Sequence, residues 1–150
     1  MNGSRRAQSG QRQSGERREA QPQHDWSHIK FGGKIDPELF SSVALSAAQR
    51  VHEADKKRNK PTQLRRIYDE LCLWEQRVLE QQESFDDCLP FIRMMNAKVA
   101  YAKGRELVDD TYQSLFQHTL NEVKDPASLR TCKLFWEAFT GFYKQERPRD

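Results

Sequence analysis

The stretch KPTQLRRIYDEL, from Lys60 to Leu71, carries the pattern of a helix with one buried face. Thr62 is expected at the N-cap, because a threonine side chain at that position can accept a hydrogen bond from a free backbone N–H. Apolar side chains then recur every three or four residues, at Leu64, Ile67, Tyr68, Leu71, Trp74 and Val78. This spacing predicts a helix that ends at the polar run formed by residues 81–84.

Two adjacent arginines, Arg65 and Arg66, fall in the first turn of this expected helix. Cations are mildly disfavoured there, because a helix begins at the positive end of its dipole. The acids four residues on, Asp69 and Glu70, stand in the weaker order for helical ion pairs, which contribute about 0.2–0.5 kcal/mol. A helix start with arginines can also bind phosphate. Residue chemistry alone leaves a solvated surface and a bound anion equally open.

Four further helices are expected outside this stretch. Asp36-Pro37 and Asp125-Pro126 each place an N-cap before a proline at the first helical position. The first pair should start a helix that runs into residues 56–59, and the second pair should start the fifth helix. A third helix should begin near residues 86–90, and a fourth should carry Val108 to Val123. Gly104 would interrupt the third helix or let another chain approach. No alternating strand pattern is present, so we predict an all-α, compact bundle of about five helices.

The length of 150 residues predicts one domain. Residues 1–24 hold five arginines, two glutamates and almost no apolar side chain, so we expect a disordered basic tail. Residues 25–35 form a lead-in segment whose apolar side chains could pack on the body, and residues 36–150 form a single helical domain. Beyond the tail, basic and acidic side chains balance, so any nucleic-acid argument rests on local clusters.

Three widely spaced cysteines, Cys72, Cys88 and Cys132, include no CxxC pair and no Cys/His cluster. They predict reduced, mostly buried thiols rather than disulfides or a zinc site. The chain also lacks the apolar run of a signal peptide and the roughly 18 consecutive apolar residues of a membrane span. We therefore expect a soluble cytoplasmic protein without membrane contact.

No enzyme motif is found, neither GxSxG nor HExxH nor a phosphate-binding or dinucleotide-binding loop. The acid pairs Asp86-Asp87 and Asp109-Asp110 are adjacent in sequence, so on a helix their members diverge by about 100°. They are typical of helix starts or surfaces rather than of a general acid/base pair. The sequence thus predicts no catalytic residues, no metal and no cofactor.

Two basic clusters remain as candidate sites. The first gathers six cations and no acid within eleven residues: Lys56, Lys57, Arg58, Lys60, Arg65 and Arg66. Its first three members are equally explained as solvated cations at a helix C-terminus. In the second, NAKVAYAKGREL (Asn96 to Leu107), Lys98, Tyr101 and Arg105 fall within about 60° of helix arc. Such a strip suits phosphates and a stacked base, although a tyrosine at a helix boundary between two cations is the alternative.

The aromatic stretch LFWEAFTGFY, residues 134–143, is expected to be core rather than a stacking platform. Together, TQLRRIYDEL, KVAYAKGREL and FWEAFTGFYK, in this order and spacing, resemble the small subunit of type III-A CRISPR effector (Csm) complexes over roughly residues 36–145. The resemblance implies a non-catalytic RNA-binding subunit in defence against foreign nucleic acid. Several copies would stack beside the other subunits and line the channel for guide RNA and target RNA, with sequence-independent backbone contacts.

The resemblance assigns RNA-binding roles to Gln63, Arg65 and Arg66 in the first motif and to Lys98, Tyr101 and Arg105 in the second. Lys56, Lys57, Arg58 and Lys60 are added from charge clustering alone. Which of these ten residues would touch RNA and which a neighbouring subunit stays open. The alternative functions are a helical adaptor that binds only proteins and a DNA-binding helix-turn-helix protein.

Overall fold

The computed structural model describes residues 24–150, which contain helices and connecting loops but no strand. Five α-helices follow a short π-helical turn: η1 (Leu39–Val43), α1 (Ala44–Ala54), α2 (Pro61–Leu79), α3 (Phe85–Gly104), α4 (Asp110–Asn121) and α5 (Pro126–Glu146). The predicted all-α class and the number of helices are confirmed. The predicted disordered tail lies outside the described residues, apart from His24.

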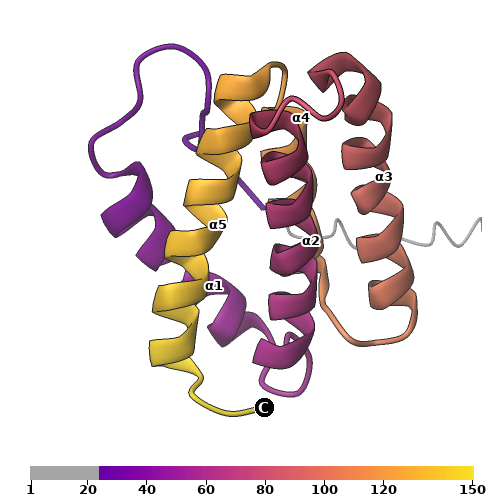
Figure 1. Ribbon diagram of the computed structural model, residues 1–150. Helices are drawn as coiled ribbons and strands as arrows, with labels where there is room; N and C mark the ends of the chain where they lie inside the picture. Colours follow the sequence, from indigo (N-terminus) through magenta and orange to yellow (C-terminus); the bar gives the residue numbers. More distant parts are fainter. Residues whose placement is uncertain (1–23) are drawn as a thin grey trace, which may run out of the picture.

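The helices form one bundle in which α5 packs against α1 and α2, and α3 packs against α2 and α4 (Figure 1). Trp136 lies at its centre, with its ring 4.8 Å from Phe139 and 5.4 Å from Phe116. Its indole N–H donates to the Thr119 hydroxyl over 2.9 Å, so the buried polar atom is satisfied. The stretch 134–143 is therefore mainly core, as its spacing predicted.

The lead-in segment, residues 25–35, packs its apolar side chains onto the bundle, and Trp26, Ile29 and Phe31 are buried. The Trp26 indole N–H donates to Ser114 Oγ over 2.9 Å, and the Arg50 guanidinium lies 3.8 Å above the same ring. The segment is thus anchored by burial and by specific polar contacts with α1 and α4.

The two Asp-Pro pairs behave differently. Asp125 is the N-cap of α5, as predicted, and accepts a hydrogen bond from Ser128 N over 2.7 Å; the Ser128 side chain completes a capping box. Asp36 instead bonds Glu38 N over 2.9 Å in a turn, and the chain becomes helical only at Leu39. The predicted helix start at Asp36-Pro37 is wrong, because the Asp36 carboxylate serves a local turn.

The first helix also ends earlier than expected, at Ala54 rather than within residues 56–59. Asp55 leaves the helix with an extended backbone (φ −153°), and one of its carboxylate oxygens accepts from the backbone N–H groups of Lys57 and Arg58, at 2.8 Å each. Asp55 therefore ends α1, and its carboxylate stabilises the loop that follows. Lys56, Lys57 and Arg58 lie in this loop and not in the last helical turn.

The start of α2 is shifted by two residues from the prediction. Pro61 occupies the first helical position, where its fixed φ suits the helix, and Lys60 is the N-cap residue without a side-chain hydrogen bond. Thr62 is therefore inside the helix and is not its cap. Arg65 and Arg66 consequently lie in the second turn, where the dipole effect that disfavours cations has largely decayed.

The remaining boundaries are close to the prediction. Ser84 caps α3 through a 3.2 Å bond from Asp87 N, so α3 begins just before the expected range. Gly104 is the last residue of α3, and no atom would lie within 4 Å of an added Cβ. Asp109 caps α4 through Tyr112 N over 3.0 Å. All three cysteines are free thiols.

Candidate nucleic-acid interface

The ten predicted RNA-binding residues gather at one end of the bundle. The connection between α1 and α2 lies there, together with the α3–α4 connection and the last turns of α5 (Figure 1). Because α2 and α3 are antiparallel, the start of α2 lies beside the end of α3, and the Lys98 ammonium pairs with the Glu70 carboxylate between them. We call this part of the molecule the basic end. The structure thus brings together two clusters that are more than 30 residues apart in the chain.

Asn59 joins the two clusters from inside. Its side chain is fully buried, donates to Asp109 Oδ1 over 2.8 Å and accepts from Asp109 N over 2.9 Å. Its backbone N–H donates to the Leu107 carbonyl over 3.0 Å, and the Tyr143 hydroxyl donates to its backbone oxygen over 2.5 Å. Asn59 has a left-handed backbone (φ 56°), which asparagine tolerates better than most residues. Through its side chain and its backbone, this one residue therefore fixes the α1–α2 loop against the α3–α4 loop and α5.

Burial of the Tyr143 ring raises the pKa of its hydroxyl above the ordinary value. The proton is therefore retained at neutral pH, and the hydroxyl can act as the donor to the Asn59 carbonyl. Arg147, just after α5, adds a second tie to the same loop, because its guanidinium donates to the Arg58 backbone oxygen over 2.5 Å. Tyr143 and Arg147 therefore both hold the α1–α2 loop through its backbone oxygens.

The first cluster divides into paired and unpaired cations. Arg58 is engaged within the protein, with ion pairs to Glu106 at 3.2 Å and to Asp55 at 3.7 Å. Lys56, Lys57 and Lys60 are exposed, and within residues 24–150 no carboxylate oxygen lies within 4.0 Å of their amino groups. These three lysines are therefore available to an external anion, whereas Arg58 mainly holds the loop.

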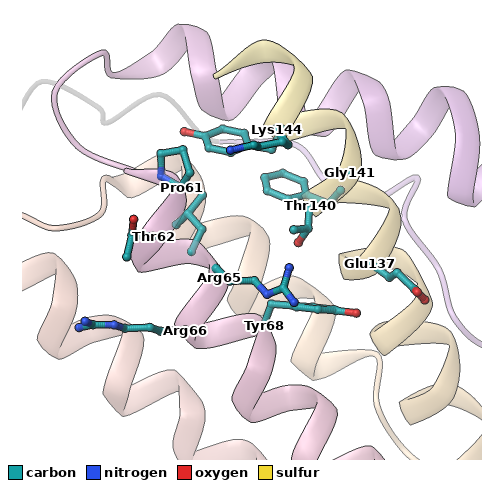
Figure 2. Close-up of a pocket in the computed structure, with 12 residues that line it drawn as sticks. Pro61, Thr62, Arg65, Arg66, Tyr68, Glu137, Thr140, Gly141 and Lys144 are labelled. Atoms are coloured by element: carbon teal, nitrogen blue, oxygen red, sulfur yellow. The ribbon is translucent and has the colours of Figure 1, made fainter. Parts of the chain in front are cut away.

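Arg65 and Arg66 leave α2 in different directions (Figure 2). The Arg65 guanidinium pairs with Asp69 at 2.9 Å and lies 5.5 Å from the Tyr68 ring centre. Hydrogen bonding to Asp69 raises the pKa of Arg65, so it remains charged. Arg66 is exposed and, within the described part of the chain, has no acidic partner. Of the two arginines, Arg66 is the one that an anion can reach without competition from a neighbouring acid.

The second cluster lies on the exposed face of α3, with the predicted strip only partly available. Tyr101 is 67% exposed, and the Arg105 guanidinium lies 5.8 Å from its ring centre. Lys98 is on the same face but is bound to Glu70 of α2. Gln63, the remaining predicted residue, is half-buried in the first turn of α2. Tyr101 and Arg105 thus form an exposed cation–aromatic pair, while Lys98 also fastens two helices.

A groove runs between the start of α2 and the last turns of α5, with a volume of about 740 Å³. Leu64, Phe139 and Tyr143 line it together with Arg65 and Lys144 (Figure 2). At its α2 side, the Asp150 carboxylate accepts hydrogen bonds from Thr62 N over 3.0 Å and from Thr62 Oγ1 over 2.5 Å. No local signal in the sequence predicts this contact, because the two residues are separated by 88 positions.

Other kinds of site find no support in the geometry of the described residues. Within residues 24–150, no three His, Cys, Asp or Glu side chains are grouped so that they could hold a metal ion. The acid pairs lie at helix starts, as predicted: Asp86 and Asp87 in the first turn of α3, Asp109 and Asp110 at the start of α4. No helix in this part of the chain combines the length and the apolar character that a membrane crossing requires.

Comparison with known protein families gives a match over most of the chain. The model of the family described as Csm2 Type III-A matches residues 36–149, which is well over half of the chain. The chain belongs to the Csm2 family. It is therefore a small subunit of a type III-A CRISPR complex, as the three motifs indicated. Csm2 is a family of structural subunits. No curated protein and no solved structure matches this chain significantly.

Proposed function

We propose that this Csm2-family chain is a cytoplasmic, non-catalytic RNA-binding subunit. Several copies stack beside the other type III-A subunits and line the channel that holds guide RNA and target RNA. The observation that carries this proposal is the basic end, where five exposed cations lack an acidic partner within residues 24–150: Lys56, Lys57, Lys60, Arg66 and Arg105.

The proposed contact is with the sugar-phosphate backbone. Lysine and arginine neutralise phosphates without reading the base, and this releases condensed counterions from the RNA. The exposed Tyr101 ring offers one stacking face beside Arg105, and stacking tolerates any base. Binding should therefore depend strongly on salt and only weakly on sequence. This suits a subunit in a complex where pairing with the guide selects the target.

The test is RNA binding by the purified protein as a function of salt. Arg66→Ala and Arg105→Ala should each weaken binding about three- to tenfold and lower the slope of log affinity against log salt by about 0.7, the value of one single-strand phosphate contact. Arg130→Ala is the matched control, because Arg130 is exposed in α5 and pairs with Glu75, away from the basic end. If the basic-end variants behave like this control, the proposed RNA contact is wrong.

The alternative, an adaptor that binds only proteins, is favoured by one observation on the outer face of α2 and α3. Leu73, Phe91 and Met94 are about half exposed there, and the Phe91 ring stacks on Trp74 at 5.7 Å. Such a patch suits contact with another subunit. Leu73→Asp should impair incorporation into the complex and leave RNA binding by the free protein unchanged. An adaptor without RNA contact would lose incorporation and show no salt-dependent RNA binding in any variant.

A further inference from the structure

The start of α2 holds an anion that comes from the protein itself. Pro61 has no N–H, and the Gln63 N–H bonds to the Lys60 carbonyl over 2.9 Å, which leaves the Thr62 N–H directed outward. This N–H and the Thr62 hydroxyl both donate to the side-chain carboxylate of Asp150, over 3.0 and 2.5 Å. A carboxylate is therefore bound by two donors at the positive end of a helix.

The surroundings of this contact favour negative charge. The two Thr62 hydrogen bonds, with smaller contributions from Lys60 and Arg147, lower the pKa of Asp150. Three further cations, Arg65, Arg66 and Lys144, line the groove that Thr62 borders, together with one acid, Glu137. A carboxylate and a phosphate diester both carry one negative charge and present two acceptor oxygens. The geometry that binds Asp150 can therefore also bind the two non-bridging oxygens of a phosphate.

The Asp150 contact is also easily exchanged. Asp150 and Thr62 are both exposed, so the hydrogen bonds compete with water, and a contact of this kind contributes little to stability. The segment that presents Asp150 has its own ties to the protein. The Lys144 ammonium donates to the Pro148 carbonyl over 2.6 Å, and the Arg147 guanidinium donates to the Arg58 carbonyl. Release of the Asp150 side chain therefore leaves the rest of the segment attached.

We propose that Thr62 is a phosphate site and that Asp150 is its internal competitor. A phosphate of bound RNA takes the two Thr62 donors, and the Asp150 side chain moves out to solvent. The inference rests on the proposed RNA binding at the basic end and adds its regulation. Because each binding event at Thr62 must release Asp150, the contact lowers the affinity of every RNA that uses this site by the same factor.

The first experiment measures RNA affinity of Asp150→Ala at fixed salt, with Glu146→Ala as the matched control. Both variants remove one carboxylate from the same end of α5, so they change net charge equally, but Glu146 does not contact Thr62. Asp150→Ala should tighten RNA binding about two- to tenfold, the range that one net hydrogen bond supplies, and Glu146→Ala by less. Equal effects of the two variants would overturn the proposal and leave RNA binding itself intact.

A second variant tests whether the RNA affinity gained in Asp150→Ala depends on the Thr62 hydroxyl. Thr62→Val keeps the shape of the side chain and removes the hydroxyl, so the double variant Thr62→Val, Asp150→Ala should lose most of the affinity gained by Asp150→Ala. If the double variant binds RNA as tightly as Asp150→Ala alone, the phosphate does not use Thr62 and the proposal fails.

The Thr62 amide resonance in an NMR titration separates this proposal from the proposed function. In Asp150→Ala, RNA and inorganic phosphate should both shift the resonance saturably, and the wild type should need more of each. A response to inorganic phosphate but not to RNA would overturn the assignment to RNA phosphates. If no variant binds RNA, the proposed function is wrong, and the phosphate titration still decides whether Asp150 competes for an anion site.

Discussion

The start of α2 and the end of α3 lie side by side at the basic end, but the first is the positive end of a helix dipole and the second is the negative end. At the start of α2, the Thr62 N–H and hydroxyl are donors, and a carboxylate is bound to them. At the end of α3, the dipole is negative, which suits Arg105 as the C-cap residue, and Lys103 forms an ion pair with Asp110.

The difference shows that cation density alone does not define an anion site. The end of α3 offers side-chain charge and an aromatic face, which suit loose contact with a passing backbone. The start of α2 adds backbone and hydroxyl donors in fixed positions, which suit one particular phosphate. Both settings depend on the inner contacts that keep the two helix ends together, and the largest predicted effect is therefore on those contacts.

Replacement of Asn59 should weaken the contacts between the start of α2 and the end of α3. Asn59→Ala deletes both side-chain hydrogen bonds to Asp109 and places alanine in a left-handed backbone, so the free energy of unfolding should fall by about 2–4 kcal/mol in urea denaturation. Asn59→Gly accepts the same backbone without strain and should recover part of this loss. Asn121→Ala, at the exposed end of α4, is the control and should change little. A loss below about 1 kcal/mol for Asn59→Ala would show that the two helix ends are held by other contacts.

The Asp55 carboxylate stabilises the loop that leads into α2, and this stabilisation depends on pH. Its hydrogen bond from the Arg58 N–H is the main cause that lowers its pKa in the folded protein, with a further bond from Lys57. A lowered folded pKa means that its contribution is present above the unfolded value of about 3.9 and is lost as pH falls through the folded value. Asp55→Ala should cost about 1 kcal/mol at pH 7. The difference from wild type in urea denaturation should shrink below about pH 4, and a difference independent of pH would contradict this account.

The sequence predicted elements whose signals are local. Asp125, Pro126 and Ser128 are neighbours, so the cap of α5 could be identified from residue types and spacing. Asp36-Pro37 has the same two residues but does not start a helix. The Asp36 carboxylate closes a turn with Glu38, and the residue types alone do not show whether an Asp-Pro pair forms a turn or a helix cap. Local signals therefore located all five helices and misplaced some of their ends.

The candidate site was only half predictable for the same reason. The exposed cations could be found from the sequence, because charge clusters are local features. Their pairing could not, because Arg58 meets Glu106 and Lys98 meets Glu70 across 48 and 28 positions. Asn59 gave no signal either, since an asparagine in a polar loop is ordinary until Asp109 is folded against it. Tertiary contacts decide which of the predicted cations remain free.

The smallest predicted effect separates two cations on the same face of α3. Lys98 already pairs with Glu70, so Lys98→Ala should weaken RNA binding less than twofold, whereas Arg105→Ala, without an acidic partner in residues 24–150, should cost about three- to tenfold. Glu70→Gln should release Lys98 and tighten RNA binding slightly at low salt. If Lys98→Ala costs as much as Arg105→Ala, the pair with Glu70 opens when RNA binds, and the α3 side holds phosphate as firmly as the α2 side.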